Sequence, residues 1–319
     1  MIISASRRTD IPAWYGEWFM ERIREGFVCV ENPFNLRQIS RIPLTPEVVD
    51  CIVFWSKNPG PMIPLLDELK GYEFYFQFTL TGYGRDIEPG LPDKRRVLIP
   101  VFQKLSEKIG CERVIWRYDP ILINGRYSLE YHRKAFGEIA GCLRGYTKRV
   151  VISFLDSYRK IEKNLEKQGV LWPSEEEMAG LAAEIAGMAR ENQMEIVSCG
   201  EKMDLQPWGI GHGSCVDKGW IERLTGCRLE GGKDKNQRAE CGCMESIDIG
   251  GYDTCRTGCI YCYANQNRDM VRKKAGNYRV GSEVLCRSIG REDVVTDRKV
   301  KSLKILQEVL TCEAVVHPV

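Results

Sequence analysis

Three cysteines stand close together near the end of the chain, at positions 255, 259 and 262, in the spacing C-x3-C-x2-C. Thiolates are soft ligands that suit iron–sulfur clusters, zinc or copper(I). Three thiolates in one loop can occupy three corners of a cubane cluster and leave its fourth iron free to bind a small chelating molecule. Gly258 allows a tight turn between the first two ligands. We therefore predict that Cys255, Cys259 and Cys262 ligate one metal cluster.

The spacing, with Tyr261 just before the last cysteine, resembles the signature of the radical S-adenosylmethionine (SAM) enzymes. The resemblance implies a [4Fe–4S] cluster whose fourth iron is chelated by the amino and carboxylate groups of SAM. It also implies that Tyr261 packs near the adenine of SAM, and that a flavodoxin or ferredoxin is the reductant. The alternatives are half of a zinc site, or buried thiols that pack as small hydrophobic groups. Zinc sites favour paired C-x2-C units, so the spacing favours a cluster.

Further cysteines fall in an irregular segment, rich in Gly, Lys and Asp, that begins at residue 199. A long segment without regular structure is unusual inside a compact domain, and metal ligation can supply the order that a small apolar core cannot. Cys199, Cys215, Cys241 and Cys243 are therefore candidates for a second cluster, with zinc as the alternative. The C-x-C spacing of the last two is a weak signal. Three other cysteines receive no role: Cys227, Cys286 and Cys312.

Composition narrows the class of protein. The chain has 319 residues, of which 43% are hydrophobic and 28% charged, so it is long enough for one large α/β domain or two modest ones. A net charge of +2 gives no strong electrostatic footprint for nucleic acid. The sequence shows no signal peptide and no apolar run of membrane-spanning length. We therefore expect a cytoplasmic protein without a membrane partner, in which fourteen cysteines serve metal chemistry rather than disulfides.

Short apolar runs alternate with helical patterns through the first 198 residues. Strands are predicted to begin near Ile2, Cys51, Phe74, Arg113, Val150 and Glu195. Helices are predicted over residues 10–26, 61–70, 93–109, 129–143, 157–168, 174–192, 265–274 and 300–310, and a hairpin over 27–39. Because five of the strands are near-continuous apolar runs, we predict a parallel sheet covered on both faces.

Polar side chains follow the strand ends, and seven of them are candidate ligand-binding residues: Arg7, Arg8, Lys57, Arg117, Asp119, Asp156 and Glu201. In a barrel such residues ring one mouth, whereas in an open doubly wound sheet they divide along a crest. We favour an α/β fold with a parallel (β/α) barrel, complete or partial, over residues 1–198. The cysteine-rich region, residues 199–319, is expected to pack on the mouth at the carboxyl ends of the strands.

Arginine holds carboxylates and phosphates through two parallel hydrogen bonds. We therefore predict that these seven residues converge in one pocket beneath the cluster and bind SAM or an anionic substrate. The alternative is that the charged residues brace the barrel rim through ion pairs. Some of them, such as Asp156, are also suited to capping a helix.

Five stretches spread along the chain carry a wider resemblance: residues 4–12, 54–59, 117–120, 235–238 and 259–265. They are similar to a bacterial family known as domain of unknown function 1848, and the similarity extends over nearly the whole chain. It implies a cysteine-rich C-terminal region of the radical SAM type, without a particular reaction. The Cys-x-Tyr-Cys-Tyr ending also resembles spore photoproduct lyase, within the loop alone.

The order of elements differs from the usual radical SAM plan, in which the cysteine loop follows the first barrel strand. Here the loop follows at least six strands, and no Gly-Gly-Glu motif is present to hold the SAM amino group. A short strand predicted around Asp248 would feed directly into the loop.

One hypothesis is a permuted relative that cleaves SAM reductively to a 5'-deoxyadenosyl radical. The other is an iron–sulfur or zinc protein without SAM, with a structural, binding or electron-transfer role.

Overall fold

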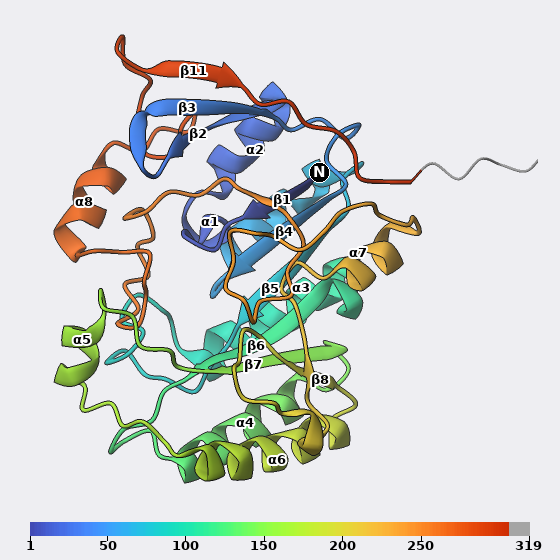
Figure 1. The fold of residues 1–319 in the computed structure, drawn as a ribbon, viewed down its shortest axis with the longest axis vertical. Helices are drawn as coiled ribbons and strands as arrows, with labels where there is room; N and C mark the ends of the chain where they lie inside the picture. The colour runs from blue at the N-terminus through green and yellow to red at the C-terminus, as the bar shows by residue number, and fades with distance from the viewer. Residues whose placement is uncertain (306–319) are drawn as a thin grey trace, which may run out of the picture.

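The computed structural model describes residues 1–305, and its centre is one parallel sheet (Figure 1). The strands are β1 (Ile2–Ala5), β4 (Cys51–Ser56), β5 (Phe74–Thr79), β6 (Val114–Ile121), β7 (Arg149–Phe154), β8 (Glu195–Ser198), β9 (Gly211–His212) and β10 (Ile247–Asp248). Their order is β10-β1-β4-β5-β6-β7-β8-β9, and every neighbouring pair is parallel. The six predicted strands are thus confirmed as parallel neighbours in sequence order.

The eight-stranded sheet is an α/β fold consistent with a partial barrel. Within residues 1–305, no ladder of hydrogen bonds joins the edge strands β9 and β10. Both edge strands come from the part of the chain after residue 198, so the cysteine-rich region contributes to the same sheet as the first part.

Both faces of the sheet are buried because the strands are apolar at consecutive positions, and consecutive side chains point to opposite faces. In β4, Ile52 and Phe54 pack in the main core with the large helices. Cys51 and Val53, one position away, pack in a second core together with side chains of residues 215–244. The second face is therefore covered by the irregular segment that follows β8.

The helices are α1 (Ile11–Trp14), α2 (Gly16–Glu25), α3 (Ile99–Ile109), α4 (Leu129–Leu143), α5 (Glu162–Lys167), α6 (Glu175–Glu191), α7 (Lys218–Thr225) and α8 (Arg268–Gly276). Side chains of α2, α3, α4 and α6 join the main core. The capping box predicted at Ser174 and Glu177 is confirmed at the start of α6. Figure 1 shows α5 and α8 on one side of the sheet, where the cysteine loop also runs.

Several helices differ from their predicted form. The segment predicted as a helix over 61–70 is a 3-10 helix, η1 (Gly60–Leu69), since Pro61 and Pro64 lack the N–H groups that an α-helix needs. The helix predicted over 93–109 begins as a π-helical turn, η2 (Lys94–Leu98), before α3. The helix predicted over 157–168 is reduced to α5, and α7 was not predicted. Two short 3-10 turns are η3 (Cys111–Arg113) and η4 (Gln206–Trp208).

The hairpin predicted after α2 is confirmed as β2 (Phe27–Asn32) and β3 (Asn35–Pro43). It belongs to a separate three-stranded sheet with β11 (Val294–Asp297), which pairs in parallel with β3. Residues 300–305 are not helical, and the remainder of the predicted 300–310 helix lies outside the described residues, as does Cys312. None of the helices within residues 1–305 combines the length and apolar character that crossing a membrane requires.

Candidate functional site

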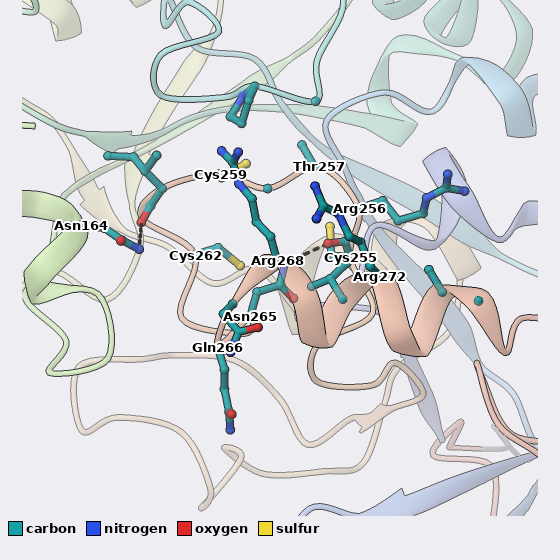
Figure 2. A pocket seen from close by; sticks show the side chains of 18 residues that line it. Asn164, Cys255, Arg256, Thr257, Cys259, Cys262, Asn265, Gln266, Arg268 and Arg272 are labelled. Carbon is teal, nitrogen blue, oxygen red and sulfur yellow. Dashed lines mark hydrogen bonds between the residues drawn. The ribbon is translucent and has the colours of Figure 1, made fainter. Parts of the chain in front are cut away.

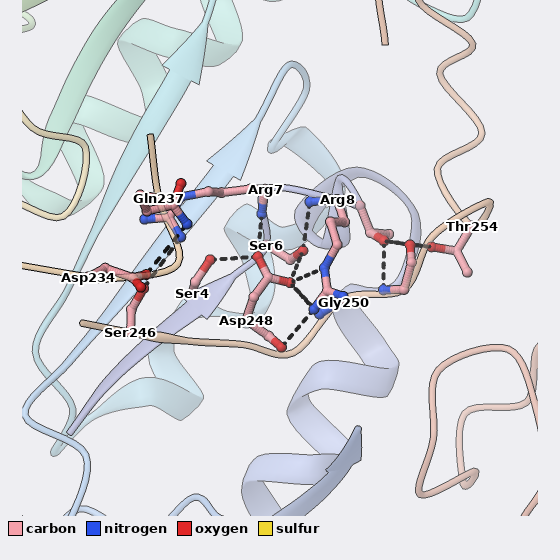
Figure 3. Close-up of polar contacts among 12 residues, drawn as sticks. Ser4, Ser6, Arg7, Arg8, Asp234, Gln237, Ser246, Asp248, Gly250 and Thr254 are labelled. Atoms are coloured by element: carbon pink, nitrogen blue, oxygen red, sulfur yellow. Dashed lines mark hydrogen bonds and ion pairs between the residues drawn. The ribbon is translucent and has the colours of Figure 1, made fainter. Parts of the chain in front are cut away.

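The short strand β10 leads directly into the cysteine loop and is held in place by Asp248 (Figure 3). The Asp248 carboxylate accepts hydrogen bonds from the hydroxyls of Ser4 (2.9 Å) and Ser6 (2.7 Å) and forms an ion pair with Arg8 (2.9 Å). The backbone amide of Gly250 also donates to it (3.0 Å). Burial raises the pKa of Asp248, but Arg8 and these hydrogen bonds outweigh burial and lower it. Asp248 therefore stays ionised and fastens β10 to β1.

The cysteine loop is docked on the segment between β5 and η2. The Gly90 amide donates to the Thr257 carbonyl (2.9 Å), and the Ile260 amide donates to the Ile87 carbonyl (3.1 Å). The indole of Trp14, at the end of α1, donates to the Thr257 hydroxyl (3.0 Å). A Cβ at Gly90 would lie 2.5 Å from the Thr257 carbonyl oxygen. The loop therefore approaches so closely that only glycine fits at position 90.

Cys255, Cys259 and Cys262 line one cavity of about 880 Å³, bounded by the loop, α8 and Gly90 (Figure 2). Three arginines line it as well: Arg256, Arg268 and Arg272. They are exposed at the surface, and Figure 2 shows them beside the cysteines. Sequence reasoning missed these arginines, although the spacing of four between the last two predicts a shared face once α8 is recognised.

Burial raises the pKa of all three thiols and so disfavours the thiolate form, while a few neighbouring groups offset part of this effect. Burial raises the pKa of Cys255 to about 11, against hydrogen bonds from the Thr257 side chain and the Asp10 backbone. Burial likewise raises the pKa of Cys259, and the cation of Lys57 lowers it. Burial raises the pKa of Cys262, while two backbone amides that follow it lower it. Each of the three thiols therefore lies beside hydrogen-bond donors or a positive charge that lower its pKa in part.

A buried ionic cluster lies beside Cys259 and centres on Glu88, which sequence reasoning also missed. The Glu88 carboxylate binds the Lys57 ammonium (2.8 Å) and also the Lys94 ammonium. The hydroxyl of Tyr261 contacts both Glu88 and Lys57, the latter at 2.7 Å. Burial raises the pKa of Glu88, but the two lysines outweigh burial and hold it far below its usual range. Tyr261 is a member of this ionic cluster and does not line the cavity, and its predicted packing near an adenine stays a prediction.

The four cysteines proposed for a second cluster come together on the other face of the sheet. The sulfurs of Cys199 and Cys215 are 3.1 Å apart. The backbone amide of Cys215 donates to the Cys243 sulfur (3.2 Å). A hydrogen bond with Cys243 lowers the pKa of Cys241 to about 7. Three segments that are separate in the sequence therefore bring four cysteines into one group.

Two arginines flank these sulfurs. The Arg117 guanidinium donates to the Cys215 sulfur (2.8 Å) and also binds Asp119, whose other oxygen accepts from the Ser153 hydroxyl. The Arg7 guanidinium stacks over the Trp55 ring, 4.9 Å from its centroid. The two arginines are therefore placed between the sulfurs and the strand ends.

The structure places the seven strand-end residues outside the cysteine cavity, and their predicted binding of SAM or an anionic substrate stays a prediction. Asp156 and Glu201 line a separate cavity of about 270 Å³. Asp156 pairs with Arg238, and the Glu201 carboxylate accepts from the Phe154 amide (2.6 Å). None of the seven lines the cysteine cavity. The physical reason is that buried charges are costly unless paired, so most of these residues bind a charged neighbour of the same rim.

Among residues 1–305, no set of three or more His, Cys, Asp or Glu side chains is already arranged to hold a metal ion. Ligation by either cysteine group therefore stays a prediction. The groups differ in their surroundings, since one lines a cavity and the other is packed in a core.

A comparison with protein-family models identifies the family of the chain. The model of a family described as Domain of unknown function (DUF1848) matches residues 2–264. The chain belongs to this family. The match includes every strand of the large sheet, and it ends just after Cys262, so the DUF1848 region contains all seven candidate ligands. No curated protein and no solved structure matches the chain.

Proposed function

We propose that this DUF1848 protein is an iron–sulfur enzyme of the radical SAM type, in which Cys255, Cys259 and Cys262 hold a [4Fe–4S] cluster. The observation that supports it best is that all three thiols line one open cavity at the end of a strand. Three cysteines leave one iron of such a cluster without a protein ligand, and the cavity gives a small molecule access to that iron.

The position of β10 supports a permuted chain order. In the radical SAM plan the cysteine loop follows the first strand of the barrel. Here β10 precedes the loop and pairs in parallel with β1, so it takes the place of a first strand although it comes late in the sequence. We interpret the sheet as a partial barrel with the cysteine-rich region over the carboxyl ends of its strands.

The residues around the cavity fit a ligand with amino and carboxylate groups. The Oδ1 atom of Asn265 is buried without a hydrogen-bond donor, and Asn265 lines the cavity. This oxygen would accept a hydrogen bond from an amino group. Arg256, Arg268 and Arg272 would attract a carboxylate, or an anionic substrate, to the same space.

Lys57 and Lys94 would offset part of the negative charge of three thiolates, since both lie close enough to Cys259 to influence its electrostatics. When bound, the cluster would supply the electron that cleaves SAM to a 5'-deoxyadenosyl radical. A flavodoxin or ferredoxin would deliver that electron, and a cytoplasmic location would keep the thiols reduced. The cysteines within residues 1–305 are free thiols, consistent with such a location.

The test is anaerobic reconstitution of the full chain with iron and sulfide, followed by reduction with dithionite in the presence of SAM. We expect about one cluster's iron and sulfide to depend on Cys255, Cys259 and Cys262, and we expect 5'-deoxyadenosine to form. The variant has all three cysteines changed to Ala. Its matched control is Cys111→Ala, a partly buried thiol outside both groups.

Iron and sulfide content that is unchanged in the triple variant would refute the cluster. A cluster that disappears in the triple variant, without 5'-deoxyadenosine in the wild type, would refute the SAM chemistry alone. That second result would favour the structural or electron-transfer role.

A further inference from the structure

The second cysteine group lies in an irregular segment that packs against one face of the sheet. Residues 199–245 cover one face of the sheet and contain little regular structure apart from α7 and the short elements η4 and β9. We propose that Cys199, Cys215, Cys241 and Cys243 together bind one zinc ion, at a site separate from the cavity cysteines and independent of the proposed SAM chemistry.

The backbone brings the four cysteines together before any metal is considered. The Gly213 amide donates to the Ser198 carbonyl (2.8 Å), which sets Cys215 beside Cys199 at the end of β8. The Met244 amide donates to the Val216 carbonyl (3.0 Å), which sets the third segment against the second. The chain around position 242 alternates buried, exposed and buried, so both cysteines of the C-x-C motif point inward.

Hydrogen bonds and charges at the site suit metal-bound thiolates. The amides of Cys215 and Val216 both donate to the Cys243 sulfur (3.2 and 3.4 Å), and such bonds are strongest when the acceptor is ionised. The Arg117 guanidinium donates to the Cys215 sulfur (2.8 Å).

A buried donor at the same place is left without a partner. The Nη2 atom of Arg7 is buried and has no hydrogen-bond acceptor among the described residues. An unmade hydrogen bond of this kind is costly. A zinc ion with four thiolates carries two net negative charges, and Arg7 and Arg117 supply two positive ones. Arg7 also stacks over Trp55 and donates through Nη1 to the Ser246 hydroxyl (3.4 Å), and the negative charge of the proposed site would face the Nη2 atom that these contacts leave without a partner.

The spacing of the sulfurs favours a single ion over a cubane. A tetrahedral zinc with Zn–S bonds of about 2.3 Å holds its sulfurs about 3.8 Å apart. The observed separation of Cys199 and Cys215, 3.1 Å, is shorter than that distance, so these two sulfurs would have to move apart to bind one ion. A cubane places each cysteine sulfur on a different iron, which needs a still wider group.

The experiment measures zinc, iron and acid-labile sulfide on the full chain, purified anaerobically without added chelator. We expect about one zinc per chain, lost in the double variant Cys241→Ser and Cys243→Ser. The cavity cluster should keep its iron and sulfide in that variant. Cys51→Ser is the matched control, because Cys51 is a buried thiol in the same core that has no sulfur neighbour of this kind.

A second measurement uses the wild-type protein and so does not require the double variant to fold. X-ray absorption at the zinc edge of the wild-type protein should show four sulfur ligands at about 2.3 Å. Nitrogen or oxygen ligands would overturn the proposal, as would zinc that persists in the double variant. Iron and sulfide in place of zinc, or a disulfide between Cys199 and Cys215 in the purified protein, would also overturn it. Replacing the three cavity cysteines should leave the zinc unchanged, so failure of the proposed function is seen separately.

Discussion

The two cysteine groups place the same type of side chain in two different surroundings, an open cavity and a packed core. Cys255, Cys259 and Cys262 come from one loop, and their sulfurs share a cavity with exposed arginines. The other four come from three segments and lie in a core, against Val216 and Trp220. A single loop can present ligands to a small molecule, whereas ligands from three segments tie those segments together.

Charge is handled differently at the two groups. Beside the cavity, the single carboxylate of Glu88 pairs with both Lys57 and Lys94, so one positive charge of the two lysines is left without a counter-charge. At the core group, Arg7 and Arg117 face sulfurs directly, and only Arg117 has a carboxylate partner. Both groups therefore lie beside positive charge that is not fully paired: the lysines share a carboxylate beside the cavity, and Arg7 lacks a carboxylate partner at the core group.

The largest expected effect follows from removing the charge at Glu88. Glu88→Gln leaves Lys57 and Lys94 buried without a counter-charge, which should cost about 3–5 kcal/mol of unfolding free energy at pH 7. Because the folded-state pKa of Glu88 is lowered, its stabilising effect exists above its unfolded pKa of about 4.3 and is lost as the pH falls further. Urea denaturation from pH 3 to 8 should show the two proteins converging in acid.

The control for Glu88 is Glu138→Gln, which breaks an exposed ion pair with Arg95 and should change stability by less than about 1 kcal/mol. Iron content should fall in Glu88→Gln while zinc stays constant, if the two groups are independent. If Glu88→Gln were as stable as the wild type at pH 7, the Glu88 carboxylate would not be needed to stabilise the buried lysines Lys57 and Lys94.

The docking of the cavity loop gives the next largest effect. Gly90→Ala forces a methyl group against the Thr257 carbonyl, which should cost about 1–3 kcal/mol and displace the loop. We expect a lower thermal midpoint and loss of cluster iron, with the core cysteines unaffected. Gly276→Ala is a matched control, because Gly276 lines the same cavity and a Cβ there meets no atom within 4 Å. Equal iron content in both variants would contradict the close approach.

These expectations rest on features that the sequence revealed to different degrees. Long apolar runs such as β4 and β5 predicted the strands and their order, because burial on both faces leaves a strong signal. The strands β9 and β10 have only two residues each, so no periodicity can mark β9, and β10 was suggested only by its place before the cysteine loop. The proline-rich η1 shows how a helical pattern can be present while the backbone lacks the donors for an α-helix.

The candidate site was partly predictable, because some of its residues are close together in the sequence and others are not. Local spacing predicted that Cys255, Cys259 and Cys262 belong together, since eight residues of chain cannot place them far apart. Spacing could not show that Glu88 joins Lys57 to Tyr261, because those residues are distant in sequence and meet only after folding. Arg7 and Arg8 follow β1 as predicted, whereas Arg117 lies within β6, and ion-pair partners such as Asp248 for Arg8 were not predicted.

A smaller effect concerns Glu201, which follows Cys199 at the end of β8. Burial raises the pKa of Glu201 to about 7, although the Phe154 amide lowers it in part. Since the folded-state pKa exceeds the unfolded value, ionisation of Glu201 makes the folded state less stable as the pH rises from about 4.5 through 7. Glu201→Gln keeps an acceptor for the amide and cannot ionise.

The Glu201→Gln variant should therefore match the wild type near pH 4.5 and exceed it at pH 8 by on the order of 2 kcal/mol. Denaturation at both pH values measures this, and Glu166→Gln on the exposed face of α5 is the control. A variant that is less stable than the wild type at pH 8 would show that the carboxylate is stabilised by a charge at this rim.

A comparison of Arg8 with Arg268 tests whether an anion binds at the strand ends or in the cysteine cavity. Arg8 is largely buried and paired with Asp248 at 2.9 Å, whereas Arg268 is exposed on the cavity wall. Arg8→Ala should lower the unfolding free energy by about 1–3 kcal/mol, because it leaves a buried carboxylate without its cation, and should not change the affinity for SAM. Arg268→Ala should leave the thermal midpoint unchanged and weaken SAM binding about two- to fivefold, the range of an exposed charge pair. Calorimetry and a binding titration on both variants separate the two roles. The opposite pattern, with affinity lost in Arg8→Ala and kept in Arg268→Ala, would place the anion at the strand ends. It would also show that Arg8 binds the ligand in place of Asp248.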